Sequence, residues 1–283
     1  MKKVLSNIFS ILLLVILFAA CTEPIDWEVD ENDAKIVVEG RFTTELKQHE
    51  IQLTKTADYF SYALPEGVSN ANVTISDGEQ TFSLTESADK AGLYLTEEIA
   101  GEVNKTYTLQ ISLNQPIGGE SQFQASSHLS PVIPIDSLSI RLDTVAGFGT
   151  EDIFWVISMW GQEVKGEESY YQASILSNGS PITESVLDYV VWNDFLVEDE
   201  YFEELDLWSG DDFFIGDTAT LVLYSSEQLY EEFIEGVRAE LEGPDELGFS
   251  GPPANAVGNV SNGGLGYFIA SDVSRATTIV PEQ

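Results

Sequence analysis

The chain is 283 residues long and carries 48 Asp and Glu against 12 Lys and Arg, a formal net charge of −36. Apolar residues make up 43 % and aromatic residues 11 %, which excludes a disordered acidic tail and suffices for one large or two ordinary folded domains. The charge excludes nucleic acid as a partner. One cysteine and two histidines exclude an internal disulfide and a Cys- or His-rich metal site.

The first 20 residues have the pattern of a secretory signal peptide. Lys2 and Lys3 give a basic start, and Ile8–Ala20 is apolar except for Ser10, a run too short to span a membrane comfortably. The residues LFAAC, ending at Cys21, resemble the lipobox of bacterial lipoproteins, whose cysteine is lipidated with diacylglycerol and palmitate. Because Cys21 is the only cysteine, we expect a lipid anchor there rather than an ordinary signal peptide with an incidental cysteine.

An acidic stretch follows the predicted anchor. Residues 21–33 contain six Asp and Glu and no base, a composition typical of a flexible tether. Removal of residues 1–20 takes away two lysines and no acid, so the mature net charge becomes −38. The stretch also resembles the surface-export signals of Bacteroidota lipoproteins. We therefore expect the protein in the outer membrane, lipid-anchored, on the cell surface.

Residues 34–130 have the pattern of an antiparallel β-sandwich. Turn signals such as Asp77-Gly78 and the segment 115–119 separate short apolar or alternating runs. These runs are Lys35–Phe42, Glu50–Thr54, Asn72–Ile75, Thr81–Leu84, Gly92–Leu95 and Thr106–Leu113. Six or seven short strands at this spacing predict an immunoglobulin-like β-sandwich. His49 lies in the polar stretch KQHE, and we expect it to be exposed.

Residues 131–283 are predicted to form a second β-rich module. The stretch His128–Pro134 holds two prolines and predicts a hinge, in which His128 is structural. Strands are predicted at Ile135–Leu142, Ile153–Met159, Ser169–Leu176, Asp188–Trp192, Thr218–Leu223 and Leu265–Ala270. The run Ile153–Met159 is apolar on both faces, which predicts a strand that is covered on both sides.

One amphipathic helix is predicted over residues 226–242. Leu229, Phe233, Val237 and Leu241 recur every four residues, and Tyr230 and Ile234 widen this stripe. Ser225 and Gln228 fit a capping box, and Gly243-Pro244 ends the helix. We expect the stripe to pack on the sheet of the second module; a partner groove is the alternative.

The segment Trp192–Asp217 is the most unusual stretch of the chain, with ten acids, no base and seven aromatic residues. Asp211, Asp212 and Asp217 flank a glycine and could supply oxygen ligands to calcium, although their spacing is not that of an EF-hand. Trp192, Tyr201, Phe202 and Trp208 could contact a sugar, a peptide or a receptor loop. The alternative is an acidic, solvated loop whose aromatic side chains fold back into the core.

Four pieces of the chain, in order, resemble a family of Bacteroidota lipoproteins, domain of unknown function 4249. They are KIVVEGRFT followed by IQLTKTADYF, then VSNANVTISDGEQTFSLTE, then IPIDSLSI, and finally PPANAVGNVSNGGLGYFIA. The resemblance covers nearly the whole mature chain. It implies a surface accessory to a TonB-dependent outer-membrane receptor and carries over no catalytic residues.

The leading interpretation is therefore a non-enzymatic lipoprotein that captures a ligand for a TonB-dependent receptor or gates that receptor. No G-x-S-x-G elbow or phosphate-binding loop occurs in the chain. No cofactor is expected apart from the possible calcium ion. The alternatives are a structural or adhesive cell-surface protein and, from a third class, a hydrolase that uses carboxylates of Trp192–Asp217.

Overall fold

The computed structural model describes residues 34–57, 64–146, 151–164, 169–193, 201–242 and 256–282. The predicted signal peptide, the lipidation site Cys21 and the acidic tether lie outside the described residues, so they stay predictions. Residues 34–283 form one compact unit. Within the described ranges, no helix is both long and apolar enough to cross a membrane. The fold is mainly β, as the sequence predicts.

Two sheets face each other in the first half of the fold. The β1 sheet contains β1 (Ile36–Thr43), β2 (Glu50–Lys55), β5 (Thr85–Glu86), β6 (Leu93–Leu95) and β16 (Leu265–Ser271), in the order β16-β1-β2-β6-β5. The β7 sheet contains β3 (Asn72–Ser76), β4 (Thr81–Ser83), β7 (Thr106–Ile117) and β8 (Glu120–His128), in the order β4-β3-β7-β8. The sandwich is confirmed; its immunoglobulin-like subtype stays a prediction.

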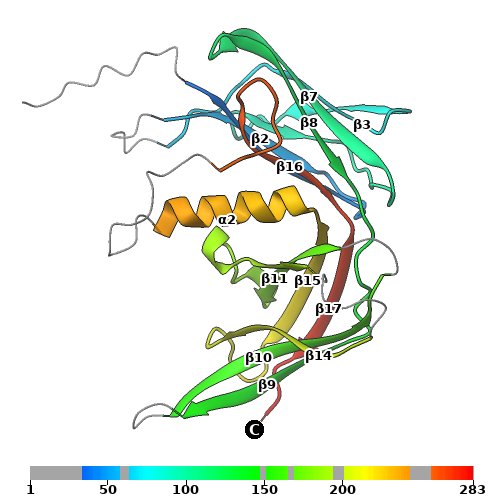
Figure 1. Cartoon of the computed structure of the whole chain (residues 1–283), viewed down its shortest axis with the longest axis vertical. Coiled ribbons are helices and arrows are strands. Elements are labelled where there is room, and N and C mark those ends of the chain that lie inside the picture. The colour runs from blue at the N-terminus through cyan, green and yellow to red at the C-terminus, as the bar shows by residue number, and fades with distance from the viewer. Residues whose placement is uncertain are drawn as a thin grey trace, which may run out of the picture. The chain divides into compact units, whose positions relative to one another are not determined.

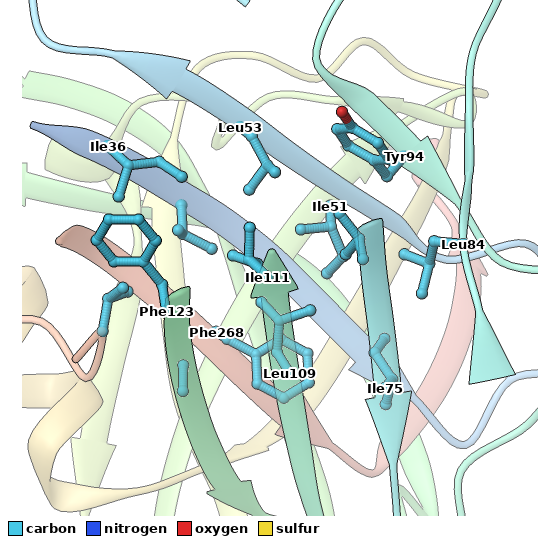
Figure 2. Close-up of a cluster of buried hydrophobic side chains, with 14 of the residues drawn as sticks. Ile36, Ile51, Leu53, Ile75, Leu84, Tyr94, Leu109, Ile111, Phe123 and Phe268 are labelled. Carbon is cyan, nitrogen blue, oxygen red and sulfur yellow. The ribbon is translucent and has the colours of Figure 1, made fainter. Parts of the chain in front are cut away.

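The core of this sandwich follows from strict alternation along its strands. In β1, Ile36, Val38 and Phe42 are fully buried, whereas Glu39 between them is exposed. Successive side chains of a strand point to opposite faces, so β1 gives one apolar face to the sandwich. Figure 2 shows the side chains from both sheets that meet there: Ile36, Ile51, Leu53, Ile75, Leu109, Ile111, Phe123 and Phe268.

One strand of the β1 sheet comes from the far end of the chain. β16 pairs with β1 in parallel, with Val37 opposite Leu265 and Thr43 opposite Ser271. β16 lies within residues 131–283, which are predicted as a second module, yet its Phe268 and Ala270 lie in the core of the sandwich. Pairing between strands so far apart in the sequence leaves no local signal, so the sequence alone does not reveal that β16 joins the first sheet.

Two further sheets form the second half. The β10 sheet contains β9 (Ser137–Ala146), β10 (Glu151–Gln162) and β14 (Tyr201–Gly210), in the order β14-β10-β9. The β11 sheet contains β11 (Tyr170–Ser177), β12 (Ser180–Pro181), β13 (Val190–Asn193), β15 (Thr218–Ser226) and β17 (Val273–Ile279). Both sheets contribute to one core, for example through Ile157 and Met159 on β10 and Ile175 on β11. Trp155 to Met159 are all buried, which confirms that this part of the strand is covered on both faces, whereas Ile153 at its start is 59 % exposed.

β16 leads directly into β17 (Figure 1), and Asp272, the single residue between them, joins three other parts of the fold. One carboxylate oxygen accepts a hydrogen bond from the Thr44 hydroxyl at 2.7 Å and the other accepts from the Val132 backbone N–H at 3.1 Å. Its backbone N–H donates to the Ser225 hydroxyl at 2.8 Å, and its carbonyl accepts from the Ser225 N–H at 3.0 Å. The end of β1, the connection before β9 and the end of β15 are thereby held at one residue.

The predicted helix exists, but it begins later than predicted, and it packs on β16 as well as beside Val191 of β13. α2 spans Gln228–Glu242, because β15 continues to Ser226 and the Ser225 hydroxyl binds Asp272 instead of capping a helix. Tyr230 and Ile234 are buried against Tyr267 and Ile269 of β16, and the short 3-10 helix η2 (Val186–Asp188) packs beside them. The helix therefore covers the outer face of the β1 sheet, and Leu229 and Leu241 of the predicted stripe are 58 % and 60 % exposed.

The two histidines differ from each other in burial. His49, predicted to be exposed, is buried: its Nε2 lies 3.0 Å from the Ile99 carbonyl oxygen, and its ring lies 4.5 Å from that of Phe42. Burial lowers the pKa of His49, so the neutral imidazole is favoured. The polar flanking residues Gln48 and Glu50 are exposed, and they hide this inward-pointing position from sequence reasoning. His128, the first residue of the predicted hinge, is instead the last residue of β8, and its side chain is exposed.

Candidate functional site: a cavity around Arg41

A cavity of about 730 Å³ lies between the outer faces of two sheets and is walled by α2. Val37, Glu39 and Arg41 line it from β1, since these positions alternate with the buried Ile36, Val38 and Phe42. Gln172 and Ser174 line it from β11 by the same alternation, because Ala173 and Ile175 point into the second core. The cavity, which we call the Arg41 cavity, thus results from two sheets that each use one face for a core.

Arg41 is half-buried and is held by neutral groups. Its Nη1 donates to the Ser271 hydroxyl at 2.9 Å, and its Nη2 donates to the Tyr230 hydroxyl at 3.1 Å and to the Gln172 side-chain oxygen. The guanidinium carbon lies 4.4 Å from the centre of the Tyr224 ring and 5.4 Å from that of Tyr230. A cation over aromatic faces is attracted by the ring quadrupole, which fixes this side chain without a carboxylate.

Aromatic side chains form one wall of the cavity. The Tyr230 and Tyr267 rings meet edge to face with centroids 5.1 Å apart, and Phe233 lies 5.3 Å from Tyr267. Tyr189 lines the same wall, and burial raises the pKa of its hydroxyl. Aromatic rings with a polar tip offer apolar contact area and a hydrogen-bonding group together, so this wall suits an organic ligand.

A half-buried carboxylate lies where α2 begins. Glu227 Oε1 accepts hydrogen bonds from the Tyr267 hydroxyl at 2.8 Å and from the Ser127 hydroxyl of β8 at 3.0 Å. Burial raises the pKa of Glu227, and the hydrogen bonds oppose that shift. Burial and the neighbouring Glu227 raise the pKa of Tyr267 far above its usual range. The Tyr267 ring, which lines the cavity, is thereby oriented from behind.

The lining groups suit binding and orientation of a ligand. Among the described lining residues there is no histidine, cysteine or lysine, and Arg41 is the one base. Glu39, Glu184 and Glu240 supply carboxylates, and all three side chains are exposed. The volume falls within the roughly 300–1,000 Å³ that is typical of small-molecule sites.

The aromatic contact residues predicted from the sequence lie elsewhere, around the second core. Trp192 is half-buried on β13 with its ring 5.4 Å from that of Tyr171, and its Nε1 has no hydrogen-bond partner among the described residues. Phe202 and Trp208 are half-buried on β14 and pack against the same core, while Tyr201 is 44 % exposed. The segment 201–210 is a strand and not a loop, and its Phe202, Leu207 and Trp208 face the second core while its acids are exposed. A role of these residues in ligand or partner contact stays a prediction.

The three candidate calcium ligands are not brought together as a metal site. Within the described ranges, no group of three or more His, Cys, Asp or Glu side chains is placed to hold a metal ion. Asp217 Oδ2 accepts from the Phe214 backbone N–H at 2.8 Å, and its Oδ1 accepts from the Asn178 side chain at 2.8 Å. These bonds lower the pKa of Asp217, the bond from Asn178 most strongly. Asp211 and Asp212 are exposed, and Asp217 acts as the stabilising residue of a turn.

Sequence reasoning missed the residues that line the Arg41 cavity. One signal was available: KIVVEGRFT places Glu39 and Arg41 on one face of a strand whose other face is apolar. Two opposite charges on the same face of a strand normally indicate that this face is exposed to solvent. Only the packing of α2 and the β11 sheet over that face shows that it lines a cavity.

The comparison with known families agrees with the resemblance noted in the sequence. No curated protein matches the chain. The family described as "Domain of unknown function (DUF4249)" matches residues 22–277, which include every described strand and helix up to the last residues of β17. The chain therefore belongs to the DUF4249 family.

Proposed function

We propose that this protein is a non-enzymatic, lipid-anchored ligand-capture protein of the outer membrane, and that it serves a TonB-dependent receptor. The observation that carries the proposal is the Arg41 cavity, in which one half-buried guanidinium and an aromatic wall enclose about 730 Å³. A concave, mostly apolar site with few polar groups is typical of small-molecule binding. Its described lining offers no nucleophile that is paired with a histidine base, which favours capture over catalysis.

The lipid anchor at Cys21 supports the membrane part of the proposal. The only cysteine follows an apolar run and two alanines, and buried acyl chains contribute about 0.8 kcal/mol of membrane affinity per methylene. This affinity offsets the repulsion between an acidic protein and anionic lipid headgroups. Residues 22–33 then lie between the anchor and the first described residue, Ala34, and serve as the tether.

The test is a pull-down of the C-terminally tagged lipoprotein from gently solubilised outer membranes, with partners identified by mass. We expect a TonB-dependent receptor in stoichiometric amount. The Cys21→Ser variant is the matched control, because it keeps residues 22–283 unchanged and is expected to leave the membrane fraction and lose the receptor. A lipidated protein that is recovered alone would contradict the accessory role and favour the adhesive alternative.

A further inference from the structure

Arg41 is the exception among the arginines of this chain. Arg141, Arg238 and Arg275 each form an ion pair, with Asp206 at 2.9 Å, Glu235 at 2.6 Å and Glu45 at 2.8 Å respectively. Arg41 has no carboxylate within ion-pair distance among the described residues, although the chain has 48 acids. A half-buried guanidinium without a counter-ion is unfavourable unless something supplies the negative charge.

The guanidinium has donors left for that charge. Three hydrogen bonds, to the Ser271 hydroxyl, the Gln172 side-chain oxygen and the Tyr230 hydroxyl, engage its two terminal nitrogens. A guanidinium carries five N–H groups in a planar fork, so it can donate to a further acceptor. Its neutral partners leave the positive charge uncompensated, and the Nε hydrogen and one Nη1 hydrogen remain for an anionic acceptor such as a carboxylate.

The other end of the cavity has the opposite charge. Glu240 lines the cavity from α2, ten residues after Tyr230. Glu39 lies only two residues before Arg41 on the same face of β1, about 7 Å from it, so it does not mark this end. At about 1.5 Å per helical residue, Tyr230 and Glu240 are about 15 Å apart along the axis. The helix runs back along β1, because Tyr230 contacts Arg41, whereas Gly236 closely approaches Ala256, near the β16 end that pairs with Val37. The cavity is therefore positive at the Arg41 end and negative at the Glu240 end.

This charge layout selects a class of ligand. A polyanion would be repelled by Glu39, Glu184 and Glu240, and a simple cation would be repelled by Arg41. A ligand with one carboxylate and, some 15 Å away, one ammonium group satisfies both ends, and the aromatic wall between them accepts apolar side chains. At about 3.3 Å per extended residue, this distance corresponds to a peptide of about four residues.

We propose that the Arg41 cavity binds a short peptide with free termini, its carboxylate on Arg41 and its amino group beside Glu240. This inference rests on the proposed capture function and names its ligand class. Specificity would come from the two charged ends and not from particular side chains, since the wall between them is formed by aromatic rings that accept varied apolar groups.

The experiment uses the detergent-solubilised, lipidated protein and native mass spectrometry with three tetrapeptide pools of the form Ala-X-X-Ala, X being Leu, Tyr or Thr. One pool has free termini, the second has a C-terminal amide, and the third an N-terminal acetyl group. We expect one bound peptide from the free pool and at least about tenfold weaker binding of the amide pool, because the charge on which Arg41 acts is removed. Acetylation is expected to weaken binding as well, through loss of the ammonium group.

Two variants assign the effect to the residue. Arg41→Gln should lose the difference between the free and amide pools, whereas Arg275→Gln, which removes only the exposed pair with Glu45, should keep it. The comparison of pools on the wild-type protein decides the question even if Arg41→Gln fails to fold. Equal binding of the free and amide pools, or no binding of any pool, overturns the inference. If a receptor co-purifies but no peptide binds, the accessory role stands and only the peptide inference fails. If peptide binds but no receptor co-purifies, only the accessory role fails.

Discussion

At the scale of single residues, Glu227 shows how the fold tolerates charge in a protein that is already strongly acidic. Its carboxylate accepts hydrogen bonds from Ser127 of β8 and Tyr267 of β16, and its backbone carbonyl accepts from the N–H groups of Tyr230 and Glu231 in the first turn of α2. Burial raises its pKa above that of an exposed glutamate. A raised pKa in the folded state means that the contribution of Glu227 to stability is complete below about pH 4.5 and is lost as pH rises through the folded value.

Glu227→Gln is therefore expected to be at least as stable as wild type at pH 7.5. Both hydroxyl groups donate to the same oxygen, Oε1, so an amide oxygen can accept both bonds while the buried charge is removed. The advantage should disappear at pH 4, where the wild-type side chain is protonated as well. Urea unfolding at the two pH values measures this. Glu227→Ala is the control: it leaves two buried hydroxyl groups without an acceptor and should destabilise by about 1–3 kcal/mol at both.

Arg238 is the second residue-scale case, because it connects α2 to η2. Its Nε donates to the Val186 carbonyl at 3.0 Å and its Nη2 donates to the Tyr189 carbonyl, while Nη1 binds Glu235. Hydrogen bonds from a charged donor contribute about 1.5–3 kcal/mol each when they are well made. These bonds place Tyr189 at the wall of the Arg41 cavity.

Arg238→Met should lower the free energy of unfolding by about 2 kcal/mol. Arg275→Met, which removes an exposed ion pair with Glu45, should change it by no more than about 0.5 kcal/mol. Urea denaturation followed by circular dichroism compares the two variants. Equal losses would show that the bonds from Arg238 to the backbone of η2 contribute no more than a surface ion pair.

At the scale of elements, the pairing of β1 with β16 depends on glycine. Gly266 has a φ of +87°, and a Cβ there would lie 2.1 Å from the Val38 carbonyl oxygen of the neighbouring strand. Gly258 approaches the Gly266 carbonyl so closely that a Cβ on it would lie 1.8 Å from that oxygen. Gly263 has a φ of +74° but nothing lies near its Cβ position. Gly266 thus combines a positive φ with a close contact, whereas Gly263 has the positive φ alone, so comparing the two separates the effect of backbone strain from that of steric contact.

Gly266→Ala should destabilise the protein by about 3 kcal/mol or more, since both strain and contact act against it. Gly263→Ala should cost only about 1 kcal/mol, because it has the strain alone. Thermal and urea unfolding of both variants beside wild type test this. A Gly266→Ala protein that lost no more stability than Gly263→Ala would mean that β16 can shift on β1 without cost.

The individual elements were largely predictable from the sequence, but their partners were not. Alternation in 36–42, 50–54 and 106–113 gave the strands, because each has one fully buried face. β8, β14 and β17 were missed: β14 is rich in acids, and β8 and β17 carry many Ser, Thr and Gln. The Arg41 cavity could not be predicted from the sequence, because its lining comes from five strands and two helices that are distant in sequence.

At the scale of the whole molecule, β16 and β17 bind the two halves together. β16 completes the β1 sheet, β17 completes the β11 sheet, and only Asp272 separates them. The described chain from residue 34 onward is accordingly one compact unit. Unfolding one half would expose the buried Phe268 or the β15 edge of the other, so neither half keeps its stability alone.

We therefore expect a single cooperative unfolding transition. Four of the five tryptophans, Trp155, Trp160, Trp192 and Trp208, lie in the second half. Their fluorescence reports on that half, whereas far-ultraviolet circular dichroism reports on all strands. The two signals should give the same midpoint in urea. Two separated midpoints would instead support independent modules with a boundary near residue 130.

The parallel pair β1–β16 also determines when the molecule can fold. The first described strand cannot obtain its outer neighbour until residues 265–271 are available, so almost the whole chain must be synthesised before that edge is closed. Contacts between such distant segments require loop closure before they stabilise anything, and they make folding slow. A chain that is not yet folded can be exported, so this delay is compatible with the signal peptide predicted for residues 1–20.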